Sequence, residues 1–326
     1  MKKRMIAATL AAGMLLSLSA AAADKVRIGY WTSGVSLGYG AVLESQDFLA
    51  KRGIEAEFVH FPNVNGPLSA LASGSIDLAF GAPLAGVFSS ASEGVPLKIF
   101  AATQPADVQF VVPADSPISQ LSQLKGKKIG MSPAGSSVAV IASTILQQNA
   151  GIQPSDFSLV GGNESRLAQF LAQKQVDGAA LRSVTISQLT ELKVKSIGSF
   201  AEEWQKLTHS AAVPYIGVGA VSGKLAQENP QAIAKVIAAL RDTLAWGKSH
   251  PAEVVAILQK QANLPKHDAE VYVSRWDSMN RLVFEPADID TLKRQHRVFL
   301  DSGAIKGTLD DALFDTGPYL AAKSIR

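Results

Sequence analysis

Two stretches of the chain, a hundred residues apart, share one order of apolar and polar positions: residues 71–81, LASGSIDLAFG, and residues 171–181, LAQKQVDGAAL. In each, apolar residues at helical spacing are followed by a short polar segment, an Asp, and an apolar run of strand length. Both stretches are therefore predicted to contain the last turn of a helix, a tight turn and a buried strand. Because Asp77 and Asp177 share one place in this repeat, we expect them to stabilise the turn rather than to act in catalysis.

The match extends to the preceding residues. Residues 27–30 correspond to residues 128–131, and the pair Gly53-Ile54 corresponds to Gly151-Ile152. The chain thus predicts two βαβαβ units in tandem. Parallel strands need a crossover element between them, so each unit predicts a mainly parallel sheet flanked by helices. The expected fold class is α/β, with two lobes and a cleft between them.

The remaining pattern predicts how the chain connects the lobes. Residues 32–40, rich in Ser and Gly, are expected to form a loop before a helix at 41–51. After residue 213 the repeat stops and apolar positions at helical spacing dominate. These helices need a sheet to cover, so the chain is expected to return to the first lobe through two hinge strands, residues 109–112 and 215–221. The expected division is residues 24–110 for the first part of lobe I, 111–215 for lobe II, and 216–326 for the mostly helical second part of lobe I.

The first 23 residues have the pattern of a secretory signal peptide. Lys2, Lys3 and Arg4 form a basic start, an apolar run follows, and Ala21-Ala22-Ala23 offers a small-residue cleavage site before Asp24. An uncleaved membrane anchor is the alternative, because the apolar run is nearly long enough to span a bilayer. The Ala-rich end favours cleavage, and a periplasmic location is therefore predicted.

Charge and cysteine content narrow the class of partner. The chain of 326 residues has 31 Lys and Arg, 28 Asp and Glu, and no Cys. Removing the leader removes three basic residues, so the mature chain is balanced and offers no electrostatic reason to bind nucleic acid or an anionic membrane. Without Cys, the chain has no disulfide and no thiol nucleophile.

The candidate ligand site lies in the loops that follow the predicted strands. In open α/β sheets, ligands bind at the carboxyl ends of the strands, where helix N-termini present unpaired N–H groups that favour an anion. Five such loops are predicted, at residues 31–33, 63–67, 81–83, 134–137 and 181–183. Arg182 is the one fixed positive charge among them, and it could bind a sulfonate or carboxylate bidentately. Trp31 could stack on the organic part of a ligand, although packing in the core is equally compatible with its position.

A search for catalytic chemistry finds little. The five His are scattered without the spacing of metal ligands, and the sequence has neither a Gly-x-Ser-x-Gly elbow nor a phosphate-binding loop. No metal, no cofactor and no enzymatic activity are expected.

Three segments, taken in order, carry a resemblance to a known family. They are residues 71–77 followed by Gly81-Ala82-Pro83, residues 124–130 followed by Gly135-Ser136-Ser137, and the stretch from Val213-Pro214-Tyr215 to Asn229-Pro230. With these features the mature chain resembles the periplasmic solute-binding proteins of bacterial ABC importers, in the group that handles nitrate, taurine, alkanesulfonates and thiamine-precursor pyrimidines. The resemblance implies the type II periplasmic binding fold, two lobes that close on a solute, and delivery to a membrane permease driven by an ATPase. We expect the protein to be a monomer.

The resemblance also implies a set of ligand-binding residues. Carried over by position, the residues expected to line the site, besides Trp31 and Arg182, are Ser33, Asn65, Gly66, Ala82, Ser136 and Ser137. Family members often have an aromatic or acidic residue where this chain has Arg182, and this departure favours an organic anion such as an aliphatic or aryl sulfonate. The alternatives are an aromatic carboxylate, nitrate or a thiamine-precursor pyrimidine, and more remotely an enzyme of the same fold. A chemosensory adaptor would share the fold.

Overall fold

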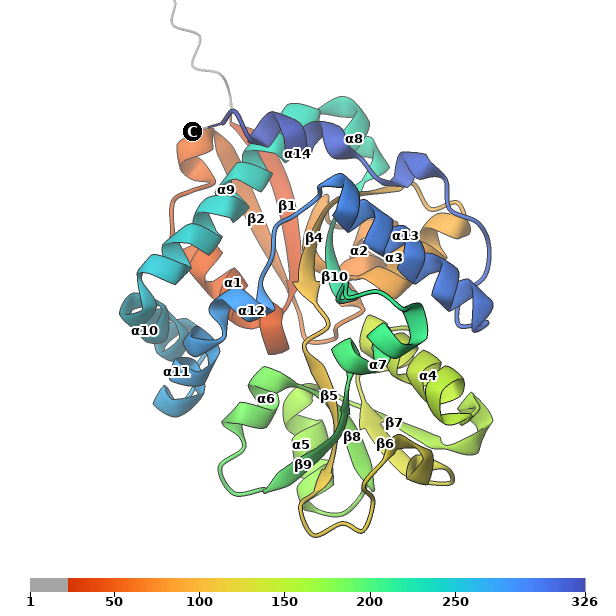
Figure 1. The fold of residues 1–326 in the computed structure, drawn as a ribbon. Helices are drawn as coiled ribbons and strands as arrows, with labels where there is room; N and C mark the ends of the chain where they lie inside the picture. Colours follow the sequence, from red (N-terminus) through yellow and green to blue (C-terminus); the bar gives the residue numbers. More distant parts are fainter. Residues whose placement is uncertain (1–22, 326) are drawn as a thin grey trace, which may run out of the picture.

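The computed structural model describes residues 23–325, which fold around two five-stranded sheets (Figure 1). The first sheet has the order β2 (Ile54–Phe61), β1 (Asp24–Trp31), β3 (Leu78–Pro83), β10 (Tyr215–Ser222), β4 (Leu97–Pro105). The second has the order β7 (Ser158–Gly161), β6 (Lys128–Met131), β8 (Gly178–Arg182), β5 (Val108–Pro113), β9 (Val194–Ser199). The predicted tandem units are thus confirmed, because both sheets have the same order and three neighbouring parallel strands. Most of the predicted leader lies outside the described residues.

One antiparallel strand in each sheet is reached by crossing from the other half of the chain. β5 follows β4 of the first sheet but pairs with β8 and β9 of the second, and β10 returns to pair with β3 and β4. The predicted boundary after residue 110 therefore falls inside β5, and residues 106 and 107 make the crossing. The two crossings lie side by side, since the Ala106 N–H donates to the Pro214 carbonyl at 2.8 Å. We call the first sheet with its helices the first lobe, and the second sheet with its helices the second lobe.

The repeated Asp has the same role in both lobes. Asp77 accepts the N–H of Arg27 at 2.9 Å, and Asp177 accepts the N–H of Lys128 at 2.8 Å. The backbone N–H of Asp77 also donates to the Arg27 carbonyl, and the backbone N–H of Asp177 donates to the Lys128 carbonyl. In both lobes the Asp therefore links one strand to the turn that precedes its neighbour in the sheet, which is the predicted turn-stabilising role.

Asp77 differs from Asp177 by an additional ion pair, and this predicts a difference in stability. Burial raises the pKa of Asp77, but hydrogen bonds from Arg27 outweigh that effect and hold the pKa below its ordinary value. The resulting stabilisation is present above the ordinary pKa of about 3.9 and is lost as the pH falls through the folded-state value. We expect Asp77→Asn to lower the free energy of unfolding by about 1–2 kcal/mol at pH 7 and to flatten its acid dependence. Urea unfolding at pH 7 and pH 3 measures the free energy of unfolding and its dependence on acid. Asp177→Asn is the matched control. If the pH dependence were equal in the two variants, the ion pair of Asp77 would not be the source of the difference.

Fourteen α-helices within residues 23–325 cover the two sheets. Those of the first lobe are α1 (Gly34–Ser45), α2 (Gly66–Ala72), α3 (Leu84–Ser92), α8 (Gly223–Glu228), α9 (Pro230–Ser249), α10 (Pro251–Gln261), α11 (Lys266–Ser274), α12 (Trp276–Met279), α13 (Pro286–Asp301) and α14 (Thr316–Ala322). Those of the second lobe are α4 (Ser137–Ala150), α5 (Glu164–Ala172), α6 (Ser183–Gln188) and α7 (Phe200–Thr208). Four single turns complete them: η1 (Ala50–Arg52), η2 (Leu121–Leu124), η3 (Pro154–Asp156) and η4 (Asp311–Leu313).

The predicted loop at residues 32–40 is wrong, because helix α1 already begins at Gly34. Gly38 and Gly40 within this helix serve close packing rather than a turn. A Cβ on Gly38 would lie 2.4 Å from the ring of Tyr272, and one on Gly40 would lie 2.2 Å from the ring of Tyr30. Tertiary packing of two aromatic rings therefore overrides the low helix propensity of these residues.

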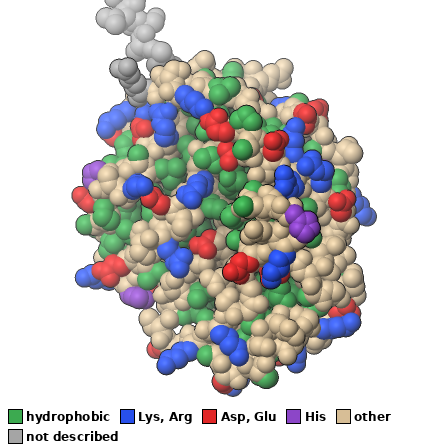
Figure 2. Space-filling view, in the orientation of Figure 1, with side chains coloured by type: hydrophobic (Ala, Val, Ile, Leu, Met, Phe, Trp, Pro, Cys, Tyr) green, Lys and Arg blue, Asp and Glu red, His purple; other side chains and the backbone are tan. Residues whose placement is uncertain are grey.

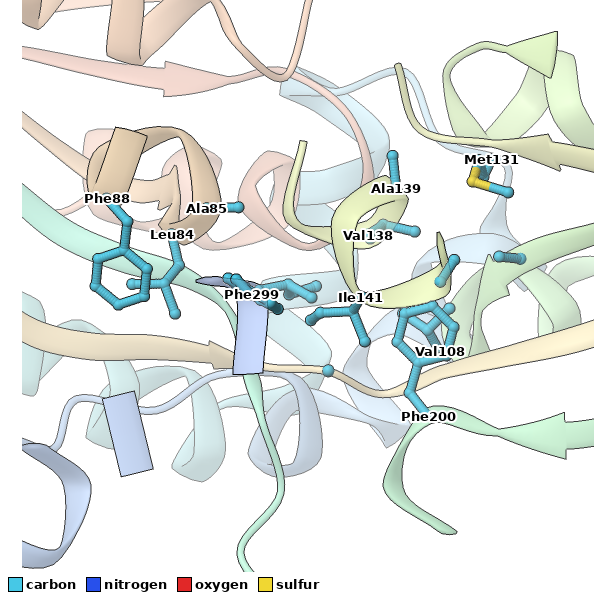
Figure 3. Close-up of a cluster of buried hydrophobic side chains, with 14 of the residues drawn as sticks. Leu84, Ala85, Phe88, Val108, Met131, Val138, Ala139, Ile141, Phe200 and Phe299 are labelled. Carbon is cyan, nitrogen blue, oxygen red and sulfur yellow. The ribbon is translucent and has the colours of Figure 1, made fainter. Parts of the chain in front are cut away.

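The cores of the two lobes are continuous, whereas the sequence suggested two lobes separated by a cleft. One cluster of buried apolar side chains includes Leu84 and Phe88 of α3, Val138 and Ile141 of α4, and Phe299 of α13 (Figure 3). Across the lobe boundary, the ring of Trp204 on α7 meets that of Phe299 edge to face at 6.0 Å between centroids. We call this contact between α3 and α13 on one side and α4 and α7 on the other the apolar seam.

One face of the molecule carries charges of both signs. Figure 2 shows acidic and basic side chains interspersed on this face rather than gathered into a patch of one sign. Within residues 23–325, no helix is both long enough and apolar enough to cross a bilayer.

Candidate functional site

The loops that follow the parallel strands of the two sheets meet at the boundary between the lobes. The side-chain amide of Asn65, after β2, donates to the carbonyl of Ala134, after β6, at 3.2 Å. The backbone N–H of Ala85, in the first turn of α3, donates to Ser137 Oγ at 3.1 Å. Strand-to-helix loops of both lobes are thus in direct contact, as expected for a ligand site built between two α/β sheets.

Trp31 and Arg182 form the centre of this boundary. The guanidinium carbon of Arg182, at the end of β8, lies 5.0 Å from the centroid of the Trp31 ring, at the end of β1. Each residue is only 4% exposed. The two predicted site residues that come from different lobes are therefore brought together, in a cation–π arrangement.

The charge of Arg182 is not free, and this corrects the expectation of an unpaired cation. Arg182 Nη1 forms an ion pair with Glu164 Oε1, and the Arg182 backbone N–H donates to Glu164 Oε2 at 3.2 Å. Both side chains are 5% exposed, so the pair is buried. Arg182 thus retains donor groups but brings little net positive charge to a ligand.

Several polar atoms at this boundary are buried without a hydrogen-bond partner. They are Trp31 Nε1, Arg182 Nε and Asn65 Oδ1, which make up three of the six such atoms in the described part of the chain. Buried polar groups in native proteins are nearly always paired, because leaving one unpaired costs about 1–3 kcal/mol. Two unpaired donors from opposite lobes, close to each other, are what an anion bound between the lobes requires.

Two cavities lie at the lobe boundary. The larger, of about 240 Å³, is lined by Trp31, Pro62, Asn63, Val64, Pro133, Gly161, Gly162, Asn163 and Arg166. The smaller, of about 80 Å³, is lined by Ser33, Gly34, Leu37, Glu164, Ser165, Val184, Thr185, Gln188, Leu264 and Tyr272. Each is walled by residues of both lobes, so a molecule bound in either one touches both.

A still larger cavity, of about 600 Å³, lies beside the crossing segments and α13. Its acidic groups are already engaged. Asp107 accepts Ser183 Oγ at 2.5 Å and pairs with Arg275 at 3.4 Å, and Asp288 accepts the hydroxyl of Tyr215 at 3.2 Å. None of the unpartnered buried atoms within residues 23–325 belongs to its lining. We therefore place the candidate site at the boundary between Trp31 and Arg182 rather than here.

The other predicted site residues have different surroundings. Ser33 lines the smaller cavity, and Ser137 makes the contact with Ala85 across the boundary. Ser136 caps α4, accepting the N–H of Ala139 at 3.3 Å. Their roles in ligand binding stay predictions.

Asn65, Gly66 and Ala82 complete the predicted set. The side chain of Asn65 makes no capping hydrogen bond with α2 and instead crosses to the second lobe, as described above. Gly66 begins α2 next to the ring of Phe61, and Ala82 is fully buried within β3. Gly66 and Ala82 line neither of the two boundary cavities.

The loop between β7 and α5 also lies at this boundary, and it is not among the five loops predicted from the sequence. This loop and the first turn of α5 supply Asn163, Glu164 and Arg166, of which Glu164 pairs with Arg182 and the other two line the larger boundary cavity. The rule used for the other five loops applies to this one as well, because it also joins a parallel strand to a helix. Its position a hundred residues after Asn63 and Asn65 was a further signal.

Known proteins resemble this chain over most of its length. Residues 41–254 match the family model described as NMT1/THI5 like. A relative from Brucella abortus (strain 2308), named "Putative binding protein", is 24% identical over 334 residues, covering 99% of this chain and 100% of the relative.

Among solved structures, the alkanesulfonate-binding protein SsuA from Xanthomonas axonopodis pv. citri, bound to MOPS, has a TM-score of 0.73 at 20% identity, covering 88% of this chain and 96% of that one. The periplasmic aliphatic sulphonate binding protein SsuA from Escherichia coli has a TM-score of 0.69 at 20% identity, covering 88% and 94%. The desulfurization enzyme DSZB has a TM-score of 0.64 at 14% identity, covering 92% and 99%. These likenesses confirm the predicted periplasmic binding protein fold, which at least one enzyme shares.

Proposed function

The chain belongs to the NMT1/THI5-like family, and from this premise we propose that it is the solute-binding component of an ABC importer that captures a small organic anion between its lobes. The favoured ligand class is a sulfonate. In this proposal residues 1–23 direct the chain to the periplasm and are removed, and the loaded protein delivers its solute to a membrane permease.

One observation carries the proposal: Trp31 and Arg182 meet across the lobe boundary, and each keeps a buried N–H without a partner. A sulfonate or carboxylate oxygen can accept from both donors at once. Because the donors come from different lobes, such a ligand makes its full set of contacts only when the lobes are closed. Ligand binding would then shift the population toward the closed arrangement.

The energetic requirement is modest. A micromolar ligand needs about 8 kcal/mol, and each hydrogen bond to a charged group contributes roughly 1.5–3 kcal/mol. Two such bonds together with burial of an apolar chain against the Trp31 ring account for an affinity of this order. The sulfonate bound to the Xanthomonas neighbour favours the same head group here.

Calorimetry on the mature protein tests the proposal. We expect saturable 1:1 binding of short alkanesulfonates and no binding of the corresponding alcohols. Aromatic carboxylates, nitrate and pyrimidines in the same panel test the alternative ligands. Mass spectrometry of the incubated ligand distinguishes a binding protein, which returns the ligand intact, from an enzyme such as DSZB with the same fold.

Substituting Trp31 tests the donor directly. Trp31→Phe keeps an aromatic ring against Arg182 and removes the indole N–H, so we expect the sulfonate dissociation constant to rise about 10- to 100-fold. Trp246, which stacks on His250 with centroids 4.6 Å apart, provides the control variant Trp246→Phe, for which affinity should not change. If calorimetry gave equal affinities for the two variants, the Trp31 N–H would not be a donor to the ligand.

A further inference from the structure

We infer that Arg166 supplies the positive charge that holds the anionic group of the ligand, and that this group lies in the boundary cavity of about 240 Å³ beside Trp31. The inference rests on the proposed function, since it concerns the same anion. The sequence pointed to Arg182 as the residue that binds the negative charge, and the inference assigns this role to Arg166 in the first turn of α5 instead.

Arg182 is poorly suited to neutralise an anion. Its guanidinium is already paired with Glu164, and both side chains are buried. An anion added beside this pair would bring the local charge to minus one in a region with little water, where unbalanced charge is costly. A second cation at the boundary removes that penalty.

Arg166 is such a cation. It is exposed, and within residues 23–325 no carboxylate lies within 4 Å of its guanidinium. The guanidinium carbon lies 5.0 Å from the centroid of the Phe170 ring, one turn along α5. The Arg166 backbone N–H is satisfied by Asn163 Oδ1 at 3.0 Å, so the helix start is held in place while the charged side chain remains available.

The cavity beside Arg166 has the composition that a small organic anion needs. Trp31, Asn63 and Val64 approach it from the first lobe, and Pro133, Gly162 and Arg166 from the second. Trp31, which lines the cavity, is 4% exposed, and its indole N–H is buried without a partner. Val64 and Pro133 offer apolar contact for a short carbon chain.

The size of the cavity limits the ligand. Its volume of about 240 Å³ is slightly below the range of about 300–1,000 Å³ that is typical of sites for drug-sized ligands, which suits a small anion. The N-terminal end of the α5 dipole adds a favourable potential for an anion. Glu164, the acidic residue in this turn, is directed to Arg182 by its ion pair.

Calorimetry with butanesulfonate and with pentanoate tests the inference and separates the two head groups. For whichever anion the native protein binds, Arg166→Gln is expected to weaken binding by about 10- to 100-fold, and Arg166→Glu more strongly. The matched control is Arg297→Gln on α13, since Arg297 is likewise exposed and no carboxylate lies within 4 Å of it in the described chain. Its affinity should equal that of the native protein.

The outcomes are distinguishable. If the native protein binds neither anion, the proposed function fails and the inference fails with it. If the native protein binds and Arg166→Gln binds equally well, the inference is overturned while the proposed function stands. Thermal unfolding midpoints of Arg166→Gln and Arg297→Gln should match that of the native protein, which excludes loss of the fold as the cause of weaker binding.

Discussion

Replacing Glu164 by Ala is expected to lower the free energy of unfolding by about 3–5 kcal/mol. The substitution leaves the guanidinium of Arg182 at 5% exposure without its counter-ion, and removing one member of a buried pair costs far more than the pair itself contributes. It also removes the acceptor of the Arg182 backbone N–H. Urea unfolding followed by circular dichroism measures the loss.

A double substitution provides the control for this prediction. In Glu164→Leu combined with Arg182→Met, both charges are replaced by apolar groups of similar length, and the free energy of unfolding should recover most of the loss. A loss below 1 kcal/mol in Glu164→Ala would mean that the buried ion pair does not exist in solution.

Replacing Phe299 by Ala is expected to lower the free energy of unfolding by about 3–5 kcal/mol and to loosen the contact between the lobes. Phe299 is fully buried in the apolar seam, where it packs edge to face against Trp204 of the second lobe. The substitution opens a cavity between α13 and α7. This cavity weakens the apolar contact that resists separation of the lobes. Urea unfolding measures the first effect, and small-angle X-ray scattering of the ligand-free protein measures the second as a larger radius of gyration.

Phe200 offers a matched control for the seam. It is equally buried, but the aromatic ring that it packs on is Phe110 of its own lobe, at 5.2 Å between centroids. Phe200→Ala should therefore destabilise the protein by a similar amount while leaving the radius of gyration unchanged. A radius that changes equally in both variants would show that Phe299 does not couple the lobes.

The features that the sequence predicts well are those in which local pattern and final contact coincide. The turn at Asp77 and its copy at Asp177 are readable because the same short motif makes the same strand contact twice. The placement of Arg182 at the lobe boundary follows from its position directly after a buried strand. Both are consequences of strand order rather than of side-chain packing.

The features that the sequence pattern does not reveal depend on contacts with residues that are distant in the chain. Gly38 and Gly40 of α1 leave room for the rings of Tyr272 and Tyr30, and the pattern within residues 32–40 alone cannot show this. The assignment of β5 to the second sheet depends on pairing with β8 and β9, which follow it by many residues. The loss of free charge at Arg182 depends on how the loop before α5 packs against the end of β8, and so on tertiary structure.

The most direct test of the central claim is a crystal structure of the protein with the anion that binds most tightly in calorimetry. The account predicts electron density for that anion at the lobe boundary, with its charged group within hydrogen-bonding distance of Trp31 Nε1 and next to Arg166. Density in the cavity of about 600 Å³ beside the crossing segments, with the boundary between Trp31 and Arg182 unchanged, would contradict it.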